Sequence, residues 1–435
     1  MTVGDSTSGR VAVIGGGPGG LLAAETLARL GCTVTVFEQM RSVGRKFLLA
    51  GRSGLNLTHS EPTRELVARY SPVPAPLSDA LAAYDADAVR SWAESLGEDT
   101  FVGSSGRVFP RSWRATPLLR AWLRRLDTLG VSIITRRRWT GVDEFTEAGQ
   151  RTLRLHFISP DTGTTDSSTT GTGTTGGDTV EVDAVVLALG GASWPRVGSN
   201  GRWTDILGQH SIEVTPLEPS NAAALVNWSP IFVERFHGVP LKNLAVTVAG
   251  VTVRGDAVVT RAGLEGTPIY AHSSRIREQC ARDGHATLLV DLHPDLTVES
   301  LSTRLVRRRP RESTTTWLRR SAGLDPVAVA LIREVVGANP DRDPAAMAEL
   351  IKSVPLTVTG LAGLERAIST AGGVSWSELD EHFMLRQLPG VFVAGEMLDW
   401  DAPTGGYLLQ ATFSTAVAAA MGAYRWVHPD RGVVL

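Results

Sequence analysis

A glycine-rich turn between an apolar run and a helix limits the fold of this chain more than any other feature of its sequence. The run Val11–Ile14 has the composition of a short, fully buried parallel strand. Gly15, Gly17 and Gly20 follow it with the spacing G-x-G-x-x-G, and apolar residues then recur at helical spacing over 21–30. This order of strand, glycine turn and helix predicts an α/β fold that opens with a Rossmann-like βα unit.

The residues of this turn suit the binding of a pyrophosphate. Gly15 permits the tight turn, Gly17 lets the backbone approach the phosphates, and Gly20 lets helix and strand pack closely. Pro18 and Gly19 open the helix, where free N–H groups and the helix dipole favour negative charge. We therefore expect all five residues to take part in holding a dinucleotide.

An acidic residue stands at the end of the next predicted strand. Thr33–Phe37 is β-branched and apolar, and Glu38 and Gln39 follow it. A carboxylate at this position accepts hydrogen bonds from ribose hydroxyls and would repel a 2′-phosphate. Strand, helix, strand and acid together predict a site for the ADP half of a dinucleotide, without separating FAD from NAD.

Three later segments favour FAD. Ala188 and Gly190 lie just after a strand, in a segment that resembles the second glycine motif of two-dinucleotide flavoproteins. Gly395 and Glu396 follow another strand, where such proteins place an acid against the ribityl chain of the flavin. The last segment enters a helix and comprises Gly405, Gly406, Tyr407 and Leu408. N–H groups at that helix start would stabilise an anionic reduced flavin.

Four further residues are candidates for the cofactor site: Arg45, Lys46, Gly54 and Trp139. Arg45 and Lys46 would reach a phosphate or line the flavin pocket, and the alternative is a solvated pair in a loop. Gly54 lies in the same loop-rich stretch. Trp139 belongs to a predicted strand pair over 131–142, in the register that would lay it over the adenine; the alternative is a partly buried strand tryptophan.

Signals for the dinucleotide domain occur at both ends of the chain, with other material between them. Short alternating runs predict an inserted β subdomain over 216–295, and helix-spaced segments predict a helical subdomain over 296–356. The FAD domain would then comprise 1–215 and 357–435. The stretch 160–178 is rich in Thr, Gly and Ser, and we expect it to be a disordered hairpin tip.

Composition excludes several other classes of protein. Two cysteines, Cys32 and Cys280, allow neither a disulfide framework nor a CxxC pair nor a cysteine-rich metal site. Three of the 43 basic residues are lysines, so the arginine runs 136–138 and 307–311 reflect a bias and are more simply solvated faces than RNA contacts. A short polar N-terminus and the absence of any run of about 18 apolar residues predict a cytoplasmic protein.

The motifs together resemble the bacterial flavoproteins grouped with BaiN-like and YhiN-like oxidoreductases. The segments that carry the resemblance span nearly the whole chain in family order: Val13–Gly20, Gly44–Gly51, Leu55–Thr58, Leu187–Pro195, Gly255–Thr260, Ala394–Asp399 and Gly405–Tyr407. The resemblance implies non-covalent FAD, a Rossmann-like domain with inserted β and helical subdomains, and reduction of carbon–carbon double bonds. One branch of the family looks to act on large-subunit ribosomal RNA, making dihydrouridine from uridine.

The chain departs from the family pattern at four positions. Leu55 stands where relatives often carry a cysteine, so no thiol is present to donate protons there, and Leu408 replaces an asparagine. Arg261 and Glu265 replace a histidine and a serine. His59, Arg261 and Glu265 are our candidates for catalytic residues that face the substrate. Arg261 would stabilise negative charge, and His59 or Glu265 would move a proton. An internal Arg261–Glu265 pair is the alternative.

We interpret the chain as an FAD-dependent oxidoreductase that transfers hydride between flavin and a carbon–carbon double bond of a small-molecule substrate. NADH or NADPH would visit the flavin transiently, because the sequence shows no second glycine turn between a strand and a helix for a nicotinamide domain. Two alternatives stay open for the function: a flavin-dependent RNA-modifying enzyme and a non-catalytic flavin-bound sensor. The protein could act as a monomer or as a homodimer.

Overall fold

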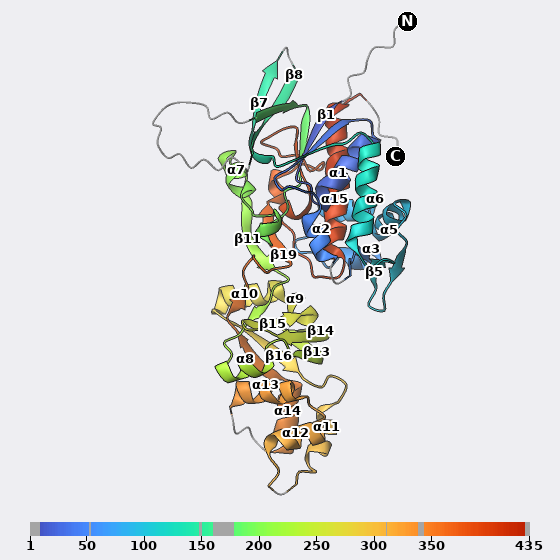
Figure 1. The fold of residues 1–435 in the computed structure, drawn as a ribbon. Helices are drawn as coiled ribbons and strands as arrows, with labels where there is room; N and C mark the ends of the chain where they lie inside the picture. The colour runs from blue at the N-terminus through green and yellow to red at the C-terminus, as the bar shows by residue number, and fades with distance from the viewer. Residues whose placement is uncertain are drawn as a thin grey trace. The chain divides into compact units, whose positions relative to one another are not determined.

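The chain folds into two compact units. The computed structural model describes residues 9–51, 54–147, 150–159, 178–309, 311–337 and 343–430. Unit 1 comprises Met1–Glu218 and Thr370–Leu435, and unit 2 comprises Pro219–Ser369 (Figure 1). Unit 2 includes most of the predicted β insertion and all of the predicted helical insertion; their separation at 295 stays a prediction. The expected disordered tip lies almost entirely outside the described residues.

Unit 1 is built on a parallel sheet. Its strands, in spatial order, are β20 (Val391–Val393), β10 (Ala184–Leu187), β1 (Arg10–Ile14), β2 (Thr33–Glu38) and β6 (Ser132–Thr135). Every neighbouring pair is parallel, and β1 runs between β10 and β2 with Val13 opposite Val186 on one side and Val36 on the other. The helix α1 (Pro18–Arg29) joins β1 to β2. The predicted strand, glycine turn, helix and strand over 10–37 are therefore confirmed.

Smaller elements surround this sheet. An antiparallel sheet consists of β7 (Arg138–Glu147), β8 (Gln150–Ile158) and β9 (Asp178–Val182), and another of β3 (Thr58–His59), β5 (Arg107–Pro110) and β4 (Thr100–Val102). A ribbon pairs β11 (Val214–Ser220) with β19 (Ser369–Val374). The helices are α2 (Arg45–Ala50), α3 (Thr63–Val67), α4 (Ala75–Ala83), α5 (Ala86–Ser95), α6 (Ala115–Thr128), α7 (Trp203–Gln209) and α15 (Tyr407–Val427), with 3-10 turns η1 (Pro195–Val197), η2 (Trp376–Glu378) and η3 (Gly395–Met397).

Two local predictions differ from the structure. The stretch around Arg45 and Lys46, expected to be loop-rich, forms the short helix α2. The predicted strand pair over 131–142 is wrong: β6 pairs with β2 in the parallel sheet, whereas β7 pairs with β8 in a separate sheet. The chain turns between them at Arg136, which has a left-handed backbone (φ +58°). That conformation is uncommon outside glycine, so hydrophobic pattern alone does not reveal the break.

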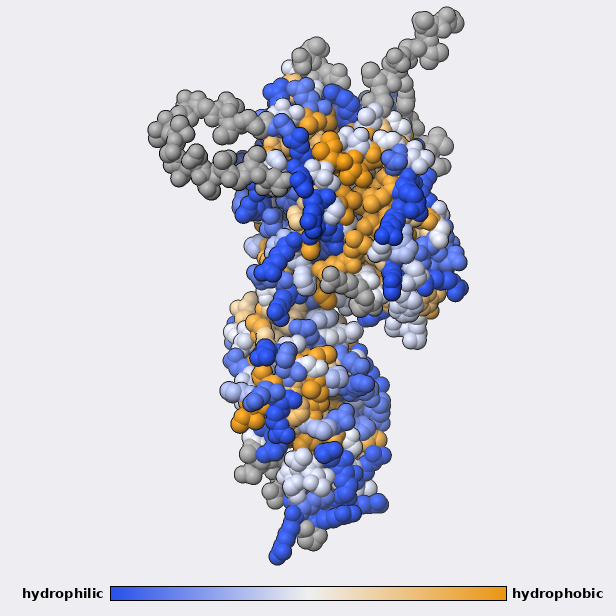
Figure 2. Space-filling view, in the orientation of Figure 1, coloured by the Kyte–Doolittle hydropathy of each residue, from blue (hydrophilic) through white to orange (hydrophobic). Residues whose placement is uncertain are grey.

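Unit 2 has a different architecture, an antiparallel sheet with helices. Its strand order is β17 (Val354–Val358), β16 (Ala286–Asp291), β13 (Pro240–Val248), β14 (Val251–Val259), β15 (Gly263–Gly266), β12 (Ala224–Leu225) and β18 (Gly360–Leu361). Its helices are α8 (Pro230–Phe236), α9 (Thr267–Tyr270), α10 (Ser273–Asp283), α11 (Val298–Leu305), α12 (Thr314–Ala322), α13 (Pro326–Val336) and α14 (Pro344–Lys352). Figure 2 shows hydrophilic residues at the end of this unit that carries α11 and α12.

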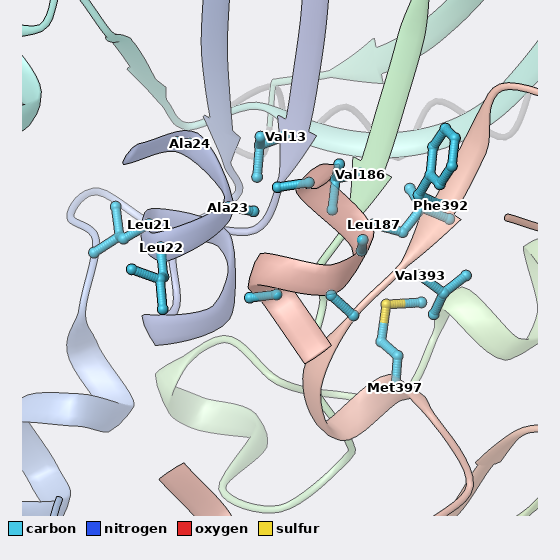
Figure 3. Packing of buried hydrophobic residues seen from close by; sticks show 14 of the residues in the cluster. Val13, Leu21, Leu22, Ala23, Ala24, Val186, Leu187, Phe392, Val393 and Met397 are labelled. Atoms are coloured by element: carbon cyan, nitrogen blue, oxygen red, sulfur yellow. The ribbon is translucent and has the colours of Figure 1, made fainter. Parts of the chain in front are cut away.

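The core of unit 1 lies between the parallel sheet and the helices α1 and α15. Figure 3 shows Val13 and Val186 from the strands, Leu21 from α1 and Met397 from η3 among the buried side chains of this core. Burying a side chain of this size stabilises the fold by about 1.5–3 kcal/mol. Small buried residues of α15, such as Ala416 and Ala420, let this helix lie directly against α1 and the sheet (Figure 1).

A buried carboxylate joins three helices of unit 1. Glu25 on α1 is 2% exposed and accepts hydrogen bonds from Trp92 Nε1 on α5 at 3.1 Å and from Arg125 Nη1 on α6 at 3.1 Å. Arg29, one turn further along α1, contributes bonds of 2.9 and 3.0 Å. A buried charge is tolerated when it is paired and hydrogen-bonded in this way.

Replacing Glu25 by alanine should lower the free energy of unfolding of unit 1 by about 3–5 kcal/mol, because Arg125 and Trp92 would keep buried polar groups without their acceptor. Urea denaturation of the Glu25→Ala variant measures the change. The matched control is Asp87→Ala on α5, whose side chain is 85% exposed and pairs with Arg90 at 3.3 Å; we expect a cost below about 1 kcal/mol. Equal costs for the two variants would contradict the proposed role of Glu25.

Candidate functional site

Several of the sequence motifs follow the carboxyl ends of strands at one edge of the parallel sheet. β1 ends at Ile14, β2 at Glu38, β10 at Leu187 and β20 at Val393, and a motif begins directly after each of these ends. The chain proceeds from β1 to β2 on one side, whereas β10 and β20 lie on the other. The loops that follow β1 and β10 therefore diverge, and open α/β sheets bind ligands in the crevice outside such a point.

The glycine turn has the close contacts that its sequence predicts. A Cβ on Gly15 (φ +108°) would lie 2.3 Å from the carbonyl oxygen of Ala188, and a Cβ on Gly20 would lie 1.9 Å from that of Gly15. Around Gly17 a Cβ would meet no described atom within 4 Å. Among the described residues, no side chain caps the start of α1, which begins at Pro18. The turn thus leaves open space beside uncapped N–H groups.

Glu38 is anchored in the glycine turn. Its Oε2 accepts from the N–H of Gly16 at 2.8 Å, and its Oε1 accepts from the N–H of Met40 at 2.7 Å. Burial raises the pKa of Glu38 above its usual range, and those two N–H groups and the guanidinium of Arg45 act in the opposite direction. The carboxylate therefore ties the end of β2 to the glycine turn.

The helix α2 starts beside the same turn. Gly44 (φ +69°) precedes it and donates its N–H to the carbonyl oxygen of Gly16 at 2.8 Å. Arg45 and Lys46 form the first turn of α2, so the structure contradicts the alternative of a solvated loop pair for these two residues. Lys46 is 28% exposed and is held in an ion pair.

That ion pair joins α2 to two motifs that are far apart in sequence. Lys46 Nζ lies 2.8 Å from Oε2 of Glu396 and 2.6 Å from Oγ of Ser193. The carboxylate of Glu396 also accepts from the N–H groups of Thr370 at 2.9 Å and Gly191 at 3.3 Å. Glu396 therefore has three donors around it, and a ribityl hydroxyl would add to or replace one of them.

The loop after β10 completes this part of the site. Gly190 (φ +71°) stands where a Cβ would lie 2.9 Å from Oγ of Ser199, which donates to the carbonyl oxygen of Gly191 at 2.6 Å. The side-chain amide of Gln39 donates to the carbonyl oxygen of Gly198. Glu38, Gln39 and this loop thus lie together, although 159 residues separate Gln39 from Gly198.

The start of α15 packs on the loop that carries β3. A Cβ on Gly406 (φ +104°) would lie 2.3 Å from the backbone of Thr58, and Gly405 has φ +134°. Glycine is required at both positions. Tyr407, buried, and Leu408, partly buried, follow as the first residues of α15, and Gly395 adjoins Thr412 one turn further on.

His59 lies next to this helix start. Its ring stacks on that of Tyr407 with 5.3 Å between centroids. Nε2 is 3.0 Å from the carbonyl oxygen of Ser105, and Nδ1 accepts from the N–H of Glu61 at 3.2 Å. Both nitrogens are therefore engaged by the backbone, which leaves His59 poorly placed to move a proton by itself.

Trp139 and Gly54 both belong to unit 1. Trp139 is 5% exposed on β7, and the backbone nearby is held to the end of β2 by the N–H of Arg137, which donates to the carbonyl oxygen of Glu38 at 2.9 Å. Gly54 (φ +109°) stands where a Cβ would lie 2.8 Å from the ring of Trp113. The roles of Trp139 over an adenine and of Gly54 stay predictions.

Four buried polar atoms in these segments have no hydrogen-bond partner within the part of the chain that the structure describes: Arg45 Nε, Asn56 Oδ1, Arg138 Nε and Trp139 Nε1. Buried polar groups are normally paired. Donors and an acceptor at the carboxyl edge, with open space at Gly17, fit an anionic dinucleotide with a polar ring system. Sequence reasoning missed Arg138, and it quoted Asn56 within a motif without assigning it a role.

Arg261 and Glu265 belong to unit 2. Arg261 is exposed in the turn between β14 and β15, and Glu265 lies on β15. Within the described residues the two side chains form no ion pair with each other. Burial and the charge of Glu265 raise the pKa of Tyr270 to about 12. The part of Arg261 and Glu265 in any reaction stays a prediction.

The parallel sheet, the glycine turn and the anchored acid define a Rossmann-type dinucleotide-binding protein. The model of the HI0933-like protein Rossmann domain matches residues 9–422. The chain therefore belongs to the HI0933-like family. The resemblance inferred from the motifs, the α/β fold and the class of FAD-dependent oxidoreductase are confirmed.

Two curated relatives match nearly the full length of the chain. The ribosomal RNA dihydrouridine synthase of Haemophilus influenzae is 25% identical over 428 residues, covering 95% of this chain and 98% of the relative. The 3-dehydro-bile acid delta(4,6)-reductase of Clostridium scindens is 24% identical over 431 residues, with coverage of 95% and 98%. A 3-ketosteroid-delta4-(5alpha)-dehydrogenase structure from Rhodococcus jostii aligns over 98% of both chains at 15% identity and a TM-score of 0.47, and we draw no conclusion from it.

Replacing Gly17 by alanine should leave the fold intact but abolish tight FAD binding. The added methyl group meets open space in the protein, and the backbone (φ −78°) accepts alanine. The same methyl group would stand where the pyrophosphate approaches the backbone, so we expect the affinity to fall about 100-fold, equivalent to about 2.8 kcal/mol. Thermal unfolding of the apo-protein and flavin titration measure the two effects.

Gly208→Ala is the matched control, because a Cβ there, on α7, also meets no described atom within 4 Å. This variant should bind FAD like the wild type. If Gly17→Ala also binds FAD normally, the glycine turn does not hold the pyrophosphate.

Proposed function

We propose that this oxidoreductase binds FAD non-covalently and transfers hydride between the flavin and a carbon–carbon double bond of a small molecule. The observation that carries the proposal is the Lys46–Glu396 pair, which joins α2, the loop after β10 and η3 at the carboxyl edge of the sheet. The full-length similarity to a bile acid delta(4,6)-reductase supports a substrate with a conjugated double bond.

Different residues of the site would bind different parts of the cofactor. The glycine turn and the start of α1 would hold the pyrophosphate, and Glu38 the adenosine ribose. Glu396 would accept from the ribityl chain, and Lys46 holds that carboxylate in place through an ion pair. Within the described segments the structure places no cysteine at this site, since Cys32 follows α1 and Cys280 lies in unit 2.

When bound, the flavin would carry two electrons and a proton. The protein's own contribution is electrostatic. The N-terminus of α15, entered through Gly405 and Gly406, directs N–H groups toward its start. Positive potential in such a place stabilises negative charge on a reduced ring system and raises its reduction potential.

NADH or NADPH is the proposed electron donor, acting at the flavin without a domain of its own. Anaerobic mixing of the purified FAD-loaded protein with each nucleotide should bleach the flavin absorbance within seconds. A conjugated enone such as cyclohex-2-enone should then restore the absorbance. If a wild-type protein reduced with dithionite is not reoxidised by any of a panel of enones, the proposed substrate class is wrong; failure with NADH and NADPH alone would exclude only that donor.

Non-covalent attachment has its own test. Acid precipitation of the protein should release all FAD into the supernatant.

RNA modification is a second candidate, favoured by a basic surface in unit 2 and by the similarity to a ribosomal RNA dihydrouridine synthase. Exposed arginines cluster on α11, α12 and the segment between them: Arg304, Arg307, Arg309, Arg311, Arg319 and Arg320. Glu312 neutralises part of this charge through a pair with Arg320 at 2.8 Å (Figure 2). Such a cluster suits phosphates of a nucleic acid.

Replacing Arg307, Arg309 and Arg311 together by alanine should weaken the binding of an RNA oligonucleotide and flatten its dependence on salt. Each lost phosphate contact lowers the slope of log affinity against log salt by about 0.7 for a single strand. Fluorescence anisotropy at several salt concentrations measures this slope. Arg282→Ala, an exposed arginine paired with Asp283 at 2.8 Å on α10, is the control and should bind RNA unchanged. Binding that is absent in the wild type would remove the RNA hypothesis.

A further inference from the structure

A cluster of ionisable side chains surrounds Tyr407 at the start of α15. Glu61 accepts a hydrogen bond from the Tyr407 hydroxyl. Arg69 holds Glu61 from the other side, with Nη2 2.8 Å from Oε2 and Nε 3.2 Å from Oε1. The His59 ring stacks on the Tyr407 ring, and the Tyr70 hydroxyl donates to the Tyr407 carbonyl oxygen at 2.8 Å.

The cluster extends from the buried hydroxyl of Tyr407 to the half-exposed side chain of Arg69 at the protein surface. Tyr407 is 6% exposed and the side chain of Glu61 is 8% exposed, whereas that of Arg69 is 50% exposed. Charged groups are seldom buried in this way unless they are paired. A phenol, a carboxylate and a guanidinium in series therefore connect the first turn of α15 to solvent.

The position of Tyr407 is the one where a proton is needed. It directly follows Gly405 and Gly406, the segment expected at the flavin ring. A Cβ on Gly405 would lie 3.0 Å from the Tyr407 ring, so glycine leaves that part of the ring free of a neighbouring side chain. Leu55, fully buried, has an aliphatic side chain and cannot supply a proton, so the acid has to come from another residue.

We propose that Tyr407 is the proton donor in the reduction of the double bond, and that Glu61, held in place by Arg69, delivers its replacement proton from water. This inference rests on the proposed function. His59 acts as a positioning residue, because both its ring nitrogens are engaged by the backbone while its face holds the Tyr407 ring.

The proposed step transfers one hydride equivalent and one proton to the double bond. One carbon of the double bond gains a hydride equivalent from reduced flavin, and the electron pair of the double bond moves to the neighbouring carbon. That carbon takes the hydroxyl proton of Tyr407, so an O–H bond breaks and a C–H bond forms. The resulting tyrosinate is stabilised by Arg69, and a proton from solvent water reaches its oxygen through Glu61.

The ionisation states of the cluster agree with this direction of transfer. Burial raises the pKa of Tyr407, and its hydrogen bond to Glu61 raises it further, so the phenol keeps its proton at neutral pH. Burial acts to raise the pKa of Glu61, but hydrogen bonds from Arg69 and Tyr407 outweigh it and the pKa is lowered. Glu61 is therefore the stronger acid once it has taken a proton from water, and passes it readily to a tyrosinate.

The first test uses FAD-loaded protein reduced with dithionite and mixed anaerobically with cyclohex-2-enone. We expect Tyr407→Phe to slow flavin reoxidation by about 100-fold or more, the usual contribution of a general acid. FAD content and reduction by dithionite should match the wild type. Tyr424→Phe is the matched control, since Tyr424 is a buried tyrosine near the other end of the same helix; it should reoxidise at the wild-type rate.

A second test needs neither flavin nor turnover. The chain has five tyrosines, so tyrosinate absorbance of the apo-protein can be followed as pH rises. In Glu61→Gln, Tyr407 should titrate at lower pH than in the wild type, because a negative neighbour has been removed, and Tyr70, which Glu61 also influences, should shift in the same direction to a smaller extent. This early transition should be missing from the Tyr407→Phe, Glu61→Gln double variant. An unchanged titration in Glu61→Gln would overturn the relay.

The outcomes separate the two proposals. A reactive wild type with an equally reactive Tyr407→Phe variant would overturn the role of Tyr407 and leave the proposed function standing. A wild type that does not react with the enone panel would overturn the proposed function, and the role of Tyr407 would fall with it. A slow Glu61→Gln with normal FAD content would support the relay even if Tyr407→Phe failed to fold.

Discussion

Backbone-to-backbone contact at the glycine turn is the constraint on which unit 1 depends. A methyl group on Gly20 would lie 1.9 Å from the carbonyl oxygen of Gly15, and one on Gly15 would lie 2.3 Å from that of Ala188. Helix α1 therefore packs against β1, and the loop after β10 packs against the turn, at distances that no side chain allows. This packing brings the ends of β1, β2 and β10 to one edge, and the motifs after β1, β2, β10 and β20 open onto that edge.

Charge at this edge is held by backbone N–H groups as much as by side chains. Glu38 accepts from Gly16 and Met40, and Glu396 accepts from Gly191 and Thr370 in addition to Lys46. Each carboxylate thus fixes two or more chain segments in one place. Because backbone donors do not change rotamer, the acids are preorganised before any ligand arrives, and little conformational entropy is lost on binding.

Local features of the sequence predicted the parts of the fold that local physics determines. An apolar run followed by closely spaced glycines fixes β1, the turn and α1, because strand burial and positive φ are encoded within a few residues. The split between β6 and β7 depends on the left-handed Arg136, and the start of α2 depends on a hydrogen bond from Gly44 to Gly16. Neither the left-handed backbone of Arg136 nor this hydrogen bond can be predicted from the hydrophobic pattern.

The candidate site shows the same division. Glu38, Lys46 and Glu396 were identified from motifs, but the pairing of Lys46 with Glu396 joins residues 350 positions apart and follows only from the fold. Glu61 and Arg69 gave no motif signal, since ordinary charged residues in the turns on either side of a short helix are usually solvated. Their importance arises from Tyr407, which tertiary packing places against them.

The burial of Tyr407 has a consequence for its proposed role as an acid. A thiol is a stronger acid than a phenol, so a site that depends on a phenol needs help to stabilise the anion left behind. Arg69 supplies positive charge through Glu61, and the start of α15 supplies N–H groups beside the same residue. Water is largely kept out, which strengthens both interactions. A weak acid such as a phenol can thus serve as the proposed proton donor, because a dry pocket with positive charge nearby stabilises the anion that it leaves.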